Sequence, residues 1–328
     1  MSFLCPPPFH SSAYINLDKK MPATTKIIFL ILPHTHLMDL AGPDQAFLEA
    51  IGYGVRLSIE YCSYANGLRT AVGLPLGKLK SYRSVKYRAG DFIIVPGAEA
   101  AFLMSKEFRA NQDLFAWLRA AYRQNVNIAS VCSGAFVLAE CGLLDGKRCT
   151  THWKRTAELQ QLYPKANVQE NILYTVHDGI YTSAGIAAGI DMSLHIIEQL
   201  AGAYLAHKVA REMVIYTRRN GEQAQQSEFL SYRNHIHAGI HNVQDWLSAN
   251  LHKKTSLFEL ADIAYMSVRN LTRIFKRETG LTINEYTAML RRERIRQLLQ
   301  NPDLSRKQIA RQCGLRSERQ LHRIINDK

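Results

Sequence analysis

The sequence has no long hydrophobic run. Its longest apolar stretch, IIFLIL at residues 27–32, has the length of a strand, whereas a membrane-spanning helix needs about 20 apolar residues. The N-terminal segment is interrupted by prolines and lacks the sustained apolar core of a secretory signal. We therefore expect a cytoplasmic protein with no membrane partner. Residues 1–22 are expected to form a disordered extension, or to precede the true start at Met21.

Cysteine is sparse, and no two cysteines lie close together in a known motif. Six cysteines are scattered over 328 residues without a C-x-x-C pair, which argues against a disulfide scaffold and fits a reducing compartment. His237 and His241 lie four residues apart, but no cysteine or acidic partner is near them in the sequence, so we expect surface histidines. No metal and no cofactor is expected.

Acidic residues are scarce toward the C-terminus. The chain carries 41 Lys and Arg against 28 Asp and Glu, a formal net charge of +13. Residues 232–328 hold 18 of the basic residues and 9 of the acidic ones, and thus most of the excess. Such an excess is the electrostatic footprint of a polyanionic partner, although a merely solvated surface carries it too.

Short apolar runs alternate with helix-like segments over the first half of the chain. This alternation is typical of a parallel sheet with helices on both faces, so we predict a doubly wound α/β domain. The expected strands are residues 26–33, 56–62, 91–97 and 125–131, and the expected helices are residues 42–53, 111–124 and 133–144.

The pattern changes after this alternation. Apolar runs at 172–176 and 180–185 flank an Asp-Gly pair, which predicts a hairpin. An amphipathic pattern then predicts one long helix over residues 187–214. Residues 218–233 are polar, rich in glutamine and without periodicity, and are expected to form a linker.

Beyond the linker the pattern is helical throughout. Four segments open with a capping box, in which a Ser or Thr and a Glu or Gln three residues later satisfy each other's backbone N–H groups. We therefore predict an all-α domain of six or seven short helices. The four pairs are Ser256 with Glu259, Thr282 with Glu285, Ser305 with Gln308, and Ser317 with Gln320.

The pattern S-x-R-x-L-x-R occurs twice, as SVRNLTR at 267–273 and as SERQLHR at 317–323. Each copy follows an apolar-Ala pair and a short turn, and the second turn is one residue longer. This is the arrangement of a helix-turn-helix, because the small alanine allows close helix approach and the serine caps the second helix. The leucine would point inward, and the two arginines of each copy would share the outer face.

Two such units in a basic region indicate a protein that reads double-stranded DNA. The first turns of a recognition helix reach base edges in the major groove, where arginine suits guanine. The alternative, a helical bundle with solvated arginines, leaves the duplicated turn unexplained. We expect base-edge contacts from Arg269, Arg273, Arg319 and Arg323 with Val268, Thr272 and His322 beside them, and phosphate contacts from Lys276, Arg277 and Arg306.

Residues 240–325 resemble the AraC/XylS-type DNA-binding domain. The resemblance rests on LADIAYMSVRNLTRIFKRETGLTINEYTAMLRRERIRQLL and on IARQCGLRSERQLHR. It implies a sequence-specific transcriptional regulator with RNA polymerase as a candidate partner. Relatives continue past the second recognition helix with a basic-aromatic run and a Gly-x-x-Pro segment, whereas this chain stops at IINDK. The second unit is therefore expected to hold its recognition helix less firmly.

The segment IASVCSGAFVLAE places Cys132 between a strand and a helix, as in a nucleophile elbow. The helix N-terminus is expected to favour the thiolate. Asp39 and His152 follow other strands, and the carboxyl ends of parallel strands meet at one edge, where ligands bind. The N–H groups of Gly97 and Ala98 are candidates to meet an oxyanion or a carboxylate. The predicted pocket consists of Asp39, Gly97, Ala98, Cys132, Ser133 and His152.

The chain from about Lys26 to Thr217 resembles the PfpI-like branch of the class I glutamine-amidotransferase-like superfamily, on VCSGAFVLAE and TSAGIAAGIDMSLH. The resemblance implies a flavodoxin-like sheet, and in hydrolytic or hydratase relatives the elbow cysteine is the nucleophile. Proteolytic relatives carry His directly after that cysteine, whereas this chain has Ser133. The domain order resembles the GlxA-like regulators, whose pocket is thought to bind a small nitrogenous metabolite, such as a betaine or an amino acid, without turnover.

Three interpretations of Cys132 stay open: a packing residue, part of an effector pocket, or a nucleophile. We favour a homodimeric regulator that binds a small-molecule effector, and we expect that the protein is not an enzyme. The alternative is a cysteine-dependent hydrolase or hydratase. The expected boundaries are 1–22 for the extension, 23–217 for the effector-sensing domain, 218–233 for the linker and 234–328 for the DNA-binding domain.

Overall fold

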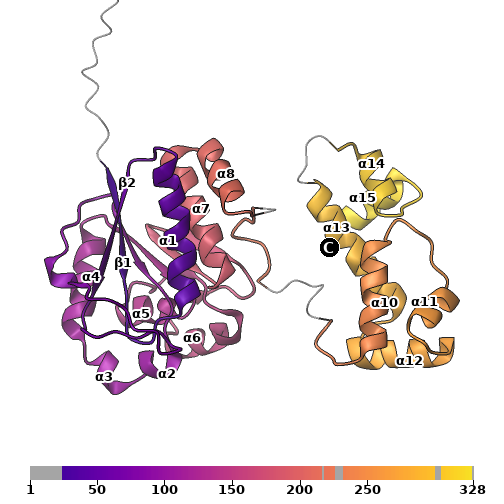
Figure 1. The fold of residues 1–328 in the computed structure, drawn as a ribbon, viewed down its shortest axis with the longest axis horizontal. Helices are drawn as coiled ribbons and strands as arrows, with labels where there is room; N and C mark the ends of the chain where they lie inside the picture. The colour runs from indigo at the N-terminus through magenta and orange to yellow at the C-terminus, as the bar shows by residue number, and fades with distance from the viewer. Residues whose placement is uncertain (1–23, 216–217, 226–231, 300–303, 327–328) are drawn as a thin grey trace, which may run out of the picture. The chain divides into compact units, whose positions relative to one another are not determined.

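The chain folds into two units (Figure 1). The computed structural model describes residues 24–215, 218–225, 232–299 and 304–326. The first unit extends to Gln223 and the second begins at Ala224, inside the segment expected as a linker. The extension expected at residues 1–22 lies outside the described residues. Within the described ranges, no helix combines the length and the apolar character needed to cross a bilayer.

The first unit is built on a seven-stranded sheet in the order β3-β2-β1-β4-β5-β9-β8. Neighbouring strands pair in parallel, except that β8 runs antiparallel to β9. The central strand β4 is buried along its whole length, as expected for a parallel sheet covered on both faces. The strands are β1 Thr25–Leu30, β2 Leu57–Ser63, β3 Lys80–Ser81, β4 Phe92–Val95, β5 Asn127–Val131, β8 Tyr174–His177 and β9 Ile180–Ser183.

Helices cover both faces of this sheet. Alternate strand residues enter different cores, so that Ile27 and Phe29 face one layer while Ile28 and Leu30 face the other. The first layer contains α1 Leu37–Gly52, α7 Ala187–Ala201 and α8 Ala203–Glu212. The second contains α4 Gln112–Arg123, α5 Gly134–Glu140 and α6 Thr156–Leu162. Smaller elements are α2 Ala100–Leu103, α3 Lys106–Arg109 and the paired strands β6 Arg148–Cys149 and β7 Asn167–Val168.

Two predicted elements differ from the structure and one is confirmed. The single helix expected over 187–214 is wrong, because Gly202 has φ of +87° and separates α7 from α8. The helix expected at 42–53 begins earlier, at Leu37, and includes Pro43. The predicted hairpin is confirmed, since Asp178 and Gly179 both have positive φ, as a type I′ turn requires.

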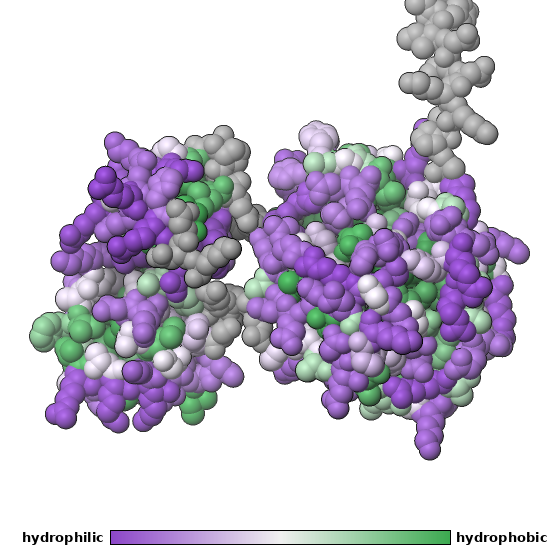
Figure 2. Space-filling model, turned by 180° about the vertical axis from the view of Figure 1, so that it is seen from behind, coloured by the Kyte–Doolittle hydropathy of each residue, from purple (hydrophilic) through white to green (hydrophobic). Residues whose placement is uncertain are grey.

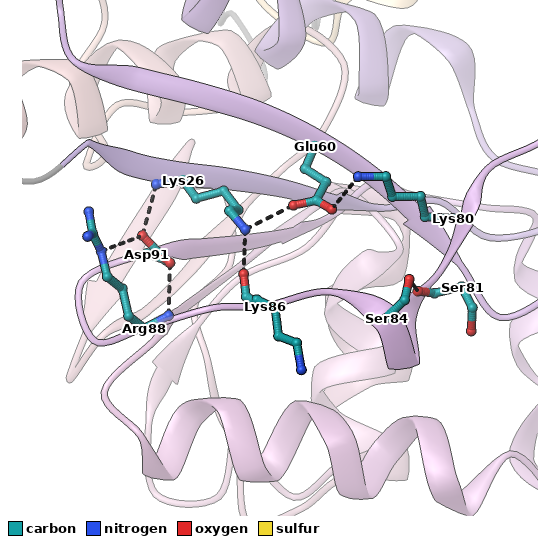
Figure 3. Close-up of polar contacts among 8 residues, drawn as sticks. All are labelled: Lys26, Glu60, Lys80, Ser81, Ser84, Lys86, Arg88 and Asp91. Carbon is teal, nitrogen blue, oxygen red and sulfur yellow. Dashed lines mark hydrogen bonds and ion pairs between the residues drawn. The ribbon is translucent and has the colours of Figure 1, made fainter.

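Hydrogen bonds and ion pairs among charged side chains connect neighbouring strands of the sheet (Figure 3). The buried Asp91 accepts hydrogen bonds of 2.9 Å from the N–H groups of Lys26 and Arg88. The carboxylate of Glu60 binds Lys26 and Lys80, each at 3.0 Å. These contacts join β1, β2 and β3 to the residue that precedes β4. This network is structural, and the carboxyl ends of the strands carry the predicted pocket.

The second unit is all-α, as predicted, and six helices lie in its described residues. They form two separate cores: Leu271, Phe275 and Tyr286 belong to the first, and Ile309 and Leu321 to the second. Only the long α13 contributes buried residues to both cores. The helices are α10 Ala238–Ala249, α11 Leu257–Ile263, α12 Val268–Thr279, α13 Ile283–Leu299, α14 Arg306–Gln312 and α15 Glu318–Asn326.

Three of the four predicted capping boxes are confirmed. Those at Ser256, Thr282 and Ser305 have both reciprocal hydrogen bonds. At the fourth, Ser317 accepts from the Gln320 N–H, but the Gln320 side chain accepts from the N–H of Arg316 instead of Ser317. The extra residue of the second turn displaces that hydrogen bond by one position.

Candidate functional site

Cys132 lies at a strained elbow between β5 and α5. Its φ is +55°, a left-handed conformation that L-residues rarely adopt. Glycines on both sides make room for it. A Cβ on Gly134 would lie 2.2 Å from the Val95 carbonyl oxygen, and a Cβ on Gly185 would lie 2.7 Å from the Cys132 sulfur. The strand-Cys-x-Gly-helix pattern therefore builds the elbow that the sequence predicts.

Asp39 is fully buried beneath the elbow, in the first turn of α1. Its Oδ1 accepts a 2.7 Å hydrogen bond from the N–H of Ile186, the residue before α7. Its Oδ2 has no hydrogen-bond partner among the described residues, and lies 3.4 Å from His36 Nδ1. The neighbouring Asp39 carboxylate raises the pKa of His36. An unsatisfied carboxylate oxygen in this position suits a ligand that donates a hydrogen bond.

The sequence argument missed His36. Its ring nitrogen, an Asp39 carboxylate oxygen and the Cys132 sulfur all lie within 4.8 Å of one another. Such N, O and S donors are of the kind that zinc binds, so these three residues could hold a metal ion. The available signal was its position three residues before Asp39, at the start of a helix that follows β1.

The surroundings of Cys132 disfavour the thiolate. Burial raises the pKa of the thiol to about 12, and the charge of Asp39 acts in the same direction. Burial and the Asp39 charge therefore oppose the expected stabilisation of the thiolate by the N-terminus of α5.

Ser133 and Ala98 hold each other. The Ser133 hydroxyl donates to the Ala98 carbonyl at 2.6 Å and accepts from the Ala98 N–H at 3.0 Å. The Ala98 N–H is thus engaged and does not serve as an oxyanion donor, contrary to the prediction. A Cβ on Gly97 would lie 2.4 Å from Asp39 Oδ2, so only glycine allows this approach, and the role of its N–H stays a prediction.

His152 is held by contacts with its sequence neighbours, and it lies close enough to Asp39 and His36 for their charges to affect its pKa. Its Nδ1 accepts from the Lys154 N–H at 3.3 Å, and its ring stacks on Trp153 with centroids 5.7 Å apart. Burial lowers its pKa, and the charge of Lys154 adds to the effect. The preceding Thr151, which the sequence argument missed, donates its hydroxyl to the Cys132 carbonyl at 2.8 Å. Among the predicted pocket residues, direct contacts join Asp39, Gly97, Ala98, Cys132 and Ser133.

The two helix-turn-helix units have the predicted architecture. Helices α11 and α12 form the first, α14 and α15 the second, and the leucine of each heptapeptide is fully buried. Arg269, Thr272 and Arg273 are exposed on α12, as are Lys276 and Arg277 near its end. Hydrophilic side chains gather on the surface at the end of the all-α unit that carries α14 and α15 (Figure 2). Arg306, Arg319, His322 and Arg323 are exposed there.

Local contacts distinguish some of these side chains. Val268 is half-buried and packs on the first core, which does not favour a base contact. Arg273 donates to the Asn270 side chain at 2.8 Å, and Arg277 forms an ion pair with Glu278 at 2.5 Å. In the second unit an Arg306 guanidinium nitrogen lies 2.6 Å from the His322 ring.

Comparison with known proteins gives the same two parts. Residues 25–199 match the DJ-1/PfpI family, and residues 260–327 match a helix-turn-helix domain family. The chain is similar to the HTH-type transcriptional regulator GbdR of Pseudomonas aeruginosa, with 33% identity over 199 residues that cover 60% of this chain and 54% of that regulator. It is also similar to the HTH-type transcriptional regulator GlxA of Rhizobium meliloti, with 27% identity over 200 residues and 61% of each chain covered.

Another relative is an enzyme. The isonitrile hydratase of Pseudomonas putida is 28% identical over 189 residues, which cover 57% of this chain and 77% of the enzyme. The matched part of this chain spans about half of GbdR and about three-fifths of GlxA.

Solved structures share the fold of the first unit. An AraC family transcriptional regulator from Pseudomonas putida superposes with a TM-score of 0.51 at 16% identity, covering 58% of this chain and 99% of that one. At this identity the likeness concerns the fold alone. The family match, in contrast, spans more than half of the chain, and the protein therefore belongs to the DJ-1/PfpI family.

Proposed function

We propose that the protein is a cytoplasmic transcriptional regulator that binds specific double-stranded DNA through its second unit and a small metabolite through its first. The observation that carries the proposal is the pair of helix-turn-helix units, each with a buried leucine between two exposed arginines. Exposed arginines on the first turns of such helices suit base edges in the major groove. A homodimer would hold paired DNA sites, and RNA polymerase is a candidate partner.

The effector that fits the first unit is small and nitrogenous. The unpartnered Oδ2 of Asp39 offers a buried acceptor to an amine or to a cationic group. Gly97 packs against the same carboxylate oxygen, and we propose that its N–H meets a ligand carboxylate. A betaine or an amino acid carries both features.

A cysteine-dependent hydratase or hydrolase is the second candidate function. The elbow geometry of Cys132 and the likeness to an isonitrile hydratase favour it. Burial of the thiol argues against it, because burial disfavours the thiolate and the thiolate is the nucleophile. We therefore propose that the pocket senses its ligand without turning it over.

Helix α7 connects this pocket to the end of the first unit. At its start, Ile186 binds Asp39. Farther along, Asp191 forms an ion pair with Arg219 at 2.5 Å, and Glu198 forms one with Arg218 at 2.7 Å. A ligand that displaces Ile186 would move the helix that anchors residues 218–223. We propose that this movement carries the effector signal toward the second unit.

The direct test is a fluorescence anisotropy titration of the full chain against its own upstream DNA and a scrambled duplex, with and without betaines and amino acids. We expect selective binding that one metabolite modulates. Arg273→Ala should weaken specific binding by about 1–3 kcal/mol and relax the preference for the native duplex. Equal binding of both duplexes by the wild-type protein, unchanged by every metabolite, would overturn the proposal. Turnover of a nitrile or isonitrile by the wild type but not by Cys132→Ala would favour the enzyme.

A further inference from the structure

The second unit contains a basic groove with no assigned ligand. This cavity, of about 430 Å³, is bounded by the segment between α10 and α11, by α13, and by the second helix-turn-helix. We call it the basic groove. Five of its lining residues are Lys or Arg, and none is acidic: Lys253, Lys254, Arg291, Arg316 and Arg323.

The positive charge of the basic groove is not neutralised within the described residues. None of the five side chains forms an ion pair with a described carboxylate. Arg291 donates to the Leu251 carbonyl at 3.3 Å, while its Nε is buried without a hydrogen-bond partner. The acidic Glu259 affects Lys253 electrostatically, but its carboxylate is engaged in the cap at Ser256. Five cations around one hollow therefore favour an anion.

A difference between the two helix-turn-helix units supplies one of these cations. In the first turn, Met266 is followed directly by the capping Ser267. In the second turn, Arg316 is inserted between Leu315 and the capping Ser317, and this inserted arginine lines the basic groove. The extra residue thus adds a positive charge where the second helix-turn-helix meets the segment between α10 and α11.

The position of the basic groove indicates which anion it takes. Its walls come from the segment between α10 and α11, from α13, and from the second helix-turn-helix, whose turn lies against that segment. A Cβ on Gly314 would lie 2.4 Å from the Leu251 carbonyl oxygen. Two helices that read successive major grooves leave a backbone segment between them, and phosphate is the group presented there.

We propose that the basic groove binds a backbone phosphate of the DNA between the two recognition helices. This inference rests on the proposed DNA binding. It reassigns Arg323, expected from the sequence to contact a base edge, to a phosphate, and leaves Arg319 and His322 of the same helix for base edges. The site would position the second helix-turn-helix on the duplex without contacting the bases that carry the sequence.

The test measures how the affinity of the full chain for DNA depends on salt. Each lost phosphate contact lowers the slope of log affinity against log salt by about 1, for any sequence. Arg316→Ala and Lys254→Ala should show this lower slope on native and scrambled duplexes alike. Arg316→Lys should keep the wild-type slope. The matched control is Arg292→Ala, which removes the same charge from an exposed neighbour of Arg291 outside the basic groove and should change the slope less.

Two results would overturn the proposal: wild-type slopes in both groove variants, or losses confined to the native duplex, which would indicate base reading. A thermal-shift titration with inorganic pyrophosphate separates this inference from the proposed function. If the wild type binds no duplex, DNA binding fails. Pyrophosphate stabilisation that Arg316→Ala abolishes would then assign the groove to a free phosphorylated ligand and reject the backbone assignment. If the wild type binds neither duplex DNA nor pyrophosphate, the basic groove is not an anion site and the proposal is rejected.

Discussion

Tyr265 and Gly314 occupy the same position in the two helix-turn-helix turns. Both are left-handed, with φ of +55° and +68°. In the first turn the N–H of Met266 donates to the Ala261 carbonyl oxygen at 2.9 Å. In the second turn the N–H of Leu315 donates to the Ala310 carbonyl oxygen, also at 2.9 Å. A glycine adopts this conformation freely, whereas a tyrosine does so at a cost. The first turn therefore carries backbone strain that the second avoids.

Tyr265→Gly should stabilise the second unit by up to about 1 kcal/mol, because the strain is relieved and the Tyr265 side chain is 93% exposed. Hydrogen exchange of peptides from this unit, measured in the full chain, would report the change. Gly314→Ala is the opposing variant, since its Cβ would clash with the Leu251 carbonyl oxygen, and it should accelerate exchange. Faster exchange in Tyr265→Gly would contradict the strain argument.

Asp39→Asn should abolish the effector response and preserve DNA binding. The amide oxygen can still accept from the Ile186 N–H, but the charged acceptor for the ligand is lost. A hydrogen bond to a charged group contributes about 1.5–3 kcal/mol, so effector affinity should fall by about tenfold or more. Calorimetric titration of the modulating metabolite measures this directly. Asp113→Asn, an exposed acid on α4, is the control, and an equal loss in both variants would count against the pocket.

The contact between His36 and Asp39 should make the stability of the first unit depend on pH. The pKa of His36 is raised above its ordinary value of 6.5 by Asp39. A raised pKa in the folded state stabilises the fold fully below the unfolded pKa, and this contribution disappears as pH rises through the folded pKa. The unfolding free energy of the wild type should therefore exceed that of His36→Gln below about pH 6.5, with the difference shrinking at higher pH. A difference that grows with pH would refute this assignment.

Arg219→Met should uncouple the effector from DNA binding. It removes the ion pair to the buried Asp191 on α7 while keeping an apolar stem of similar length. Without effector, DNA affinity should equal that of the wild type, whereas the change caused by the effector should shrink. The same anisotropy titration measures both quantities. Arg83→Met, which breaks an exposed ion pair with Asp113, is the matched control and should leave the response intact.

Local patterns predicted much of the fold and part of the site. The Asp178-Gly179 hairpin and the serine caps depend on neighbours in the sequence, and they were correctly predicted. The break at Gly202 was missed because a glycine within an amphipathic pattern fits a continuous helix equally well. His36 was missed because the crossover from β1 to α1 brings it to a cysteine 96 positions away, and its position three residues before Asp39 was the one local sign of that approach. The state of the Cys132 thiol depends on burial, which periodicity does not measure.

The separate cores of the second unit have a consequence for cooperativity. Among the described residues, the core of the second helix-turn-helix consists of Ile295, Ile309, Ala310, Cys313 and Leu321, whereas the other core has fourteen buried residues. A smaller buried area makes local opening easier, so the two halves form blocks of unequal stability that share one helix. If DNA binding suppresses that opening, part of the binding free energy offsets the conformational entropy lost. Affinity for DNA should then depend on the packing of Leu321 as well as on the arginines around it.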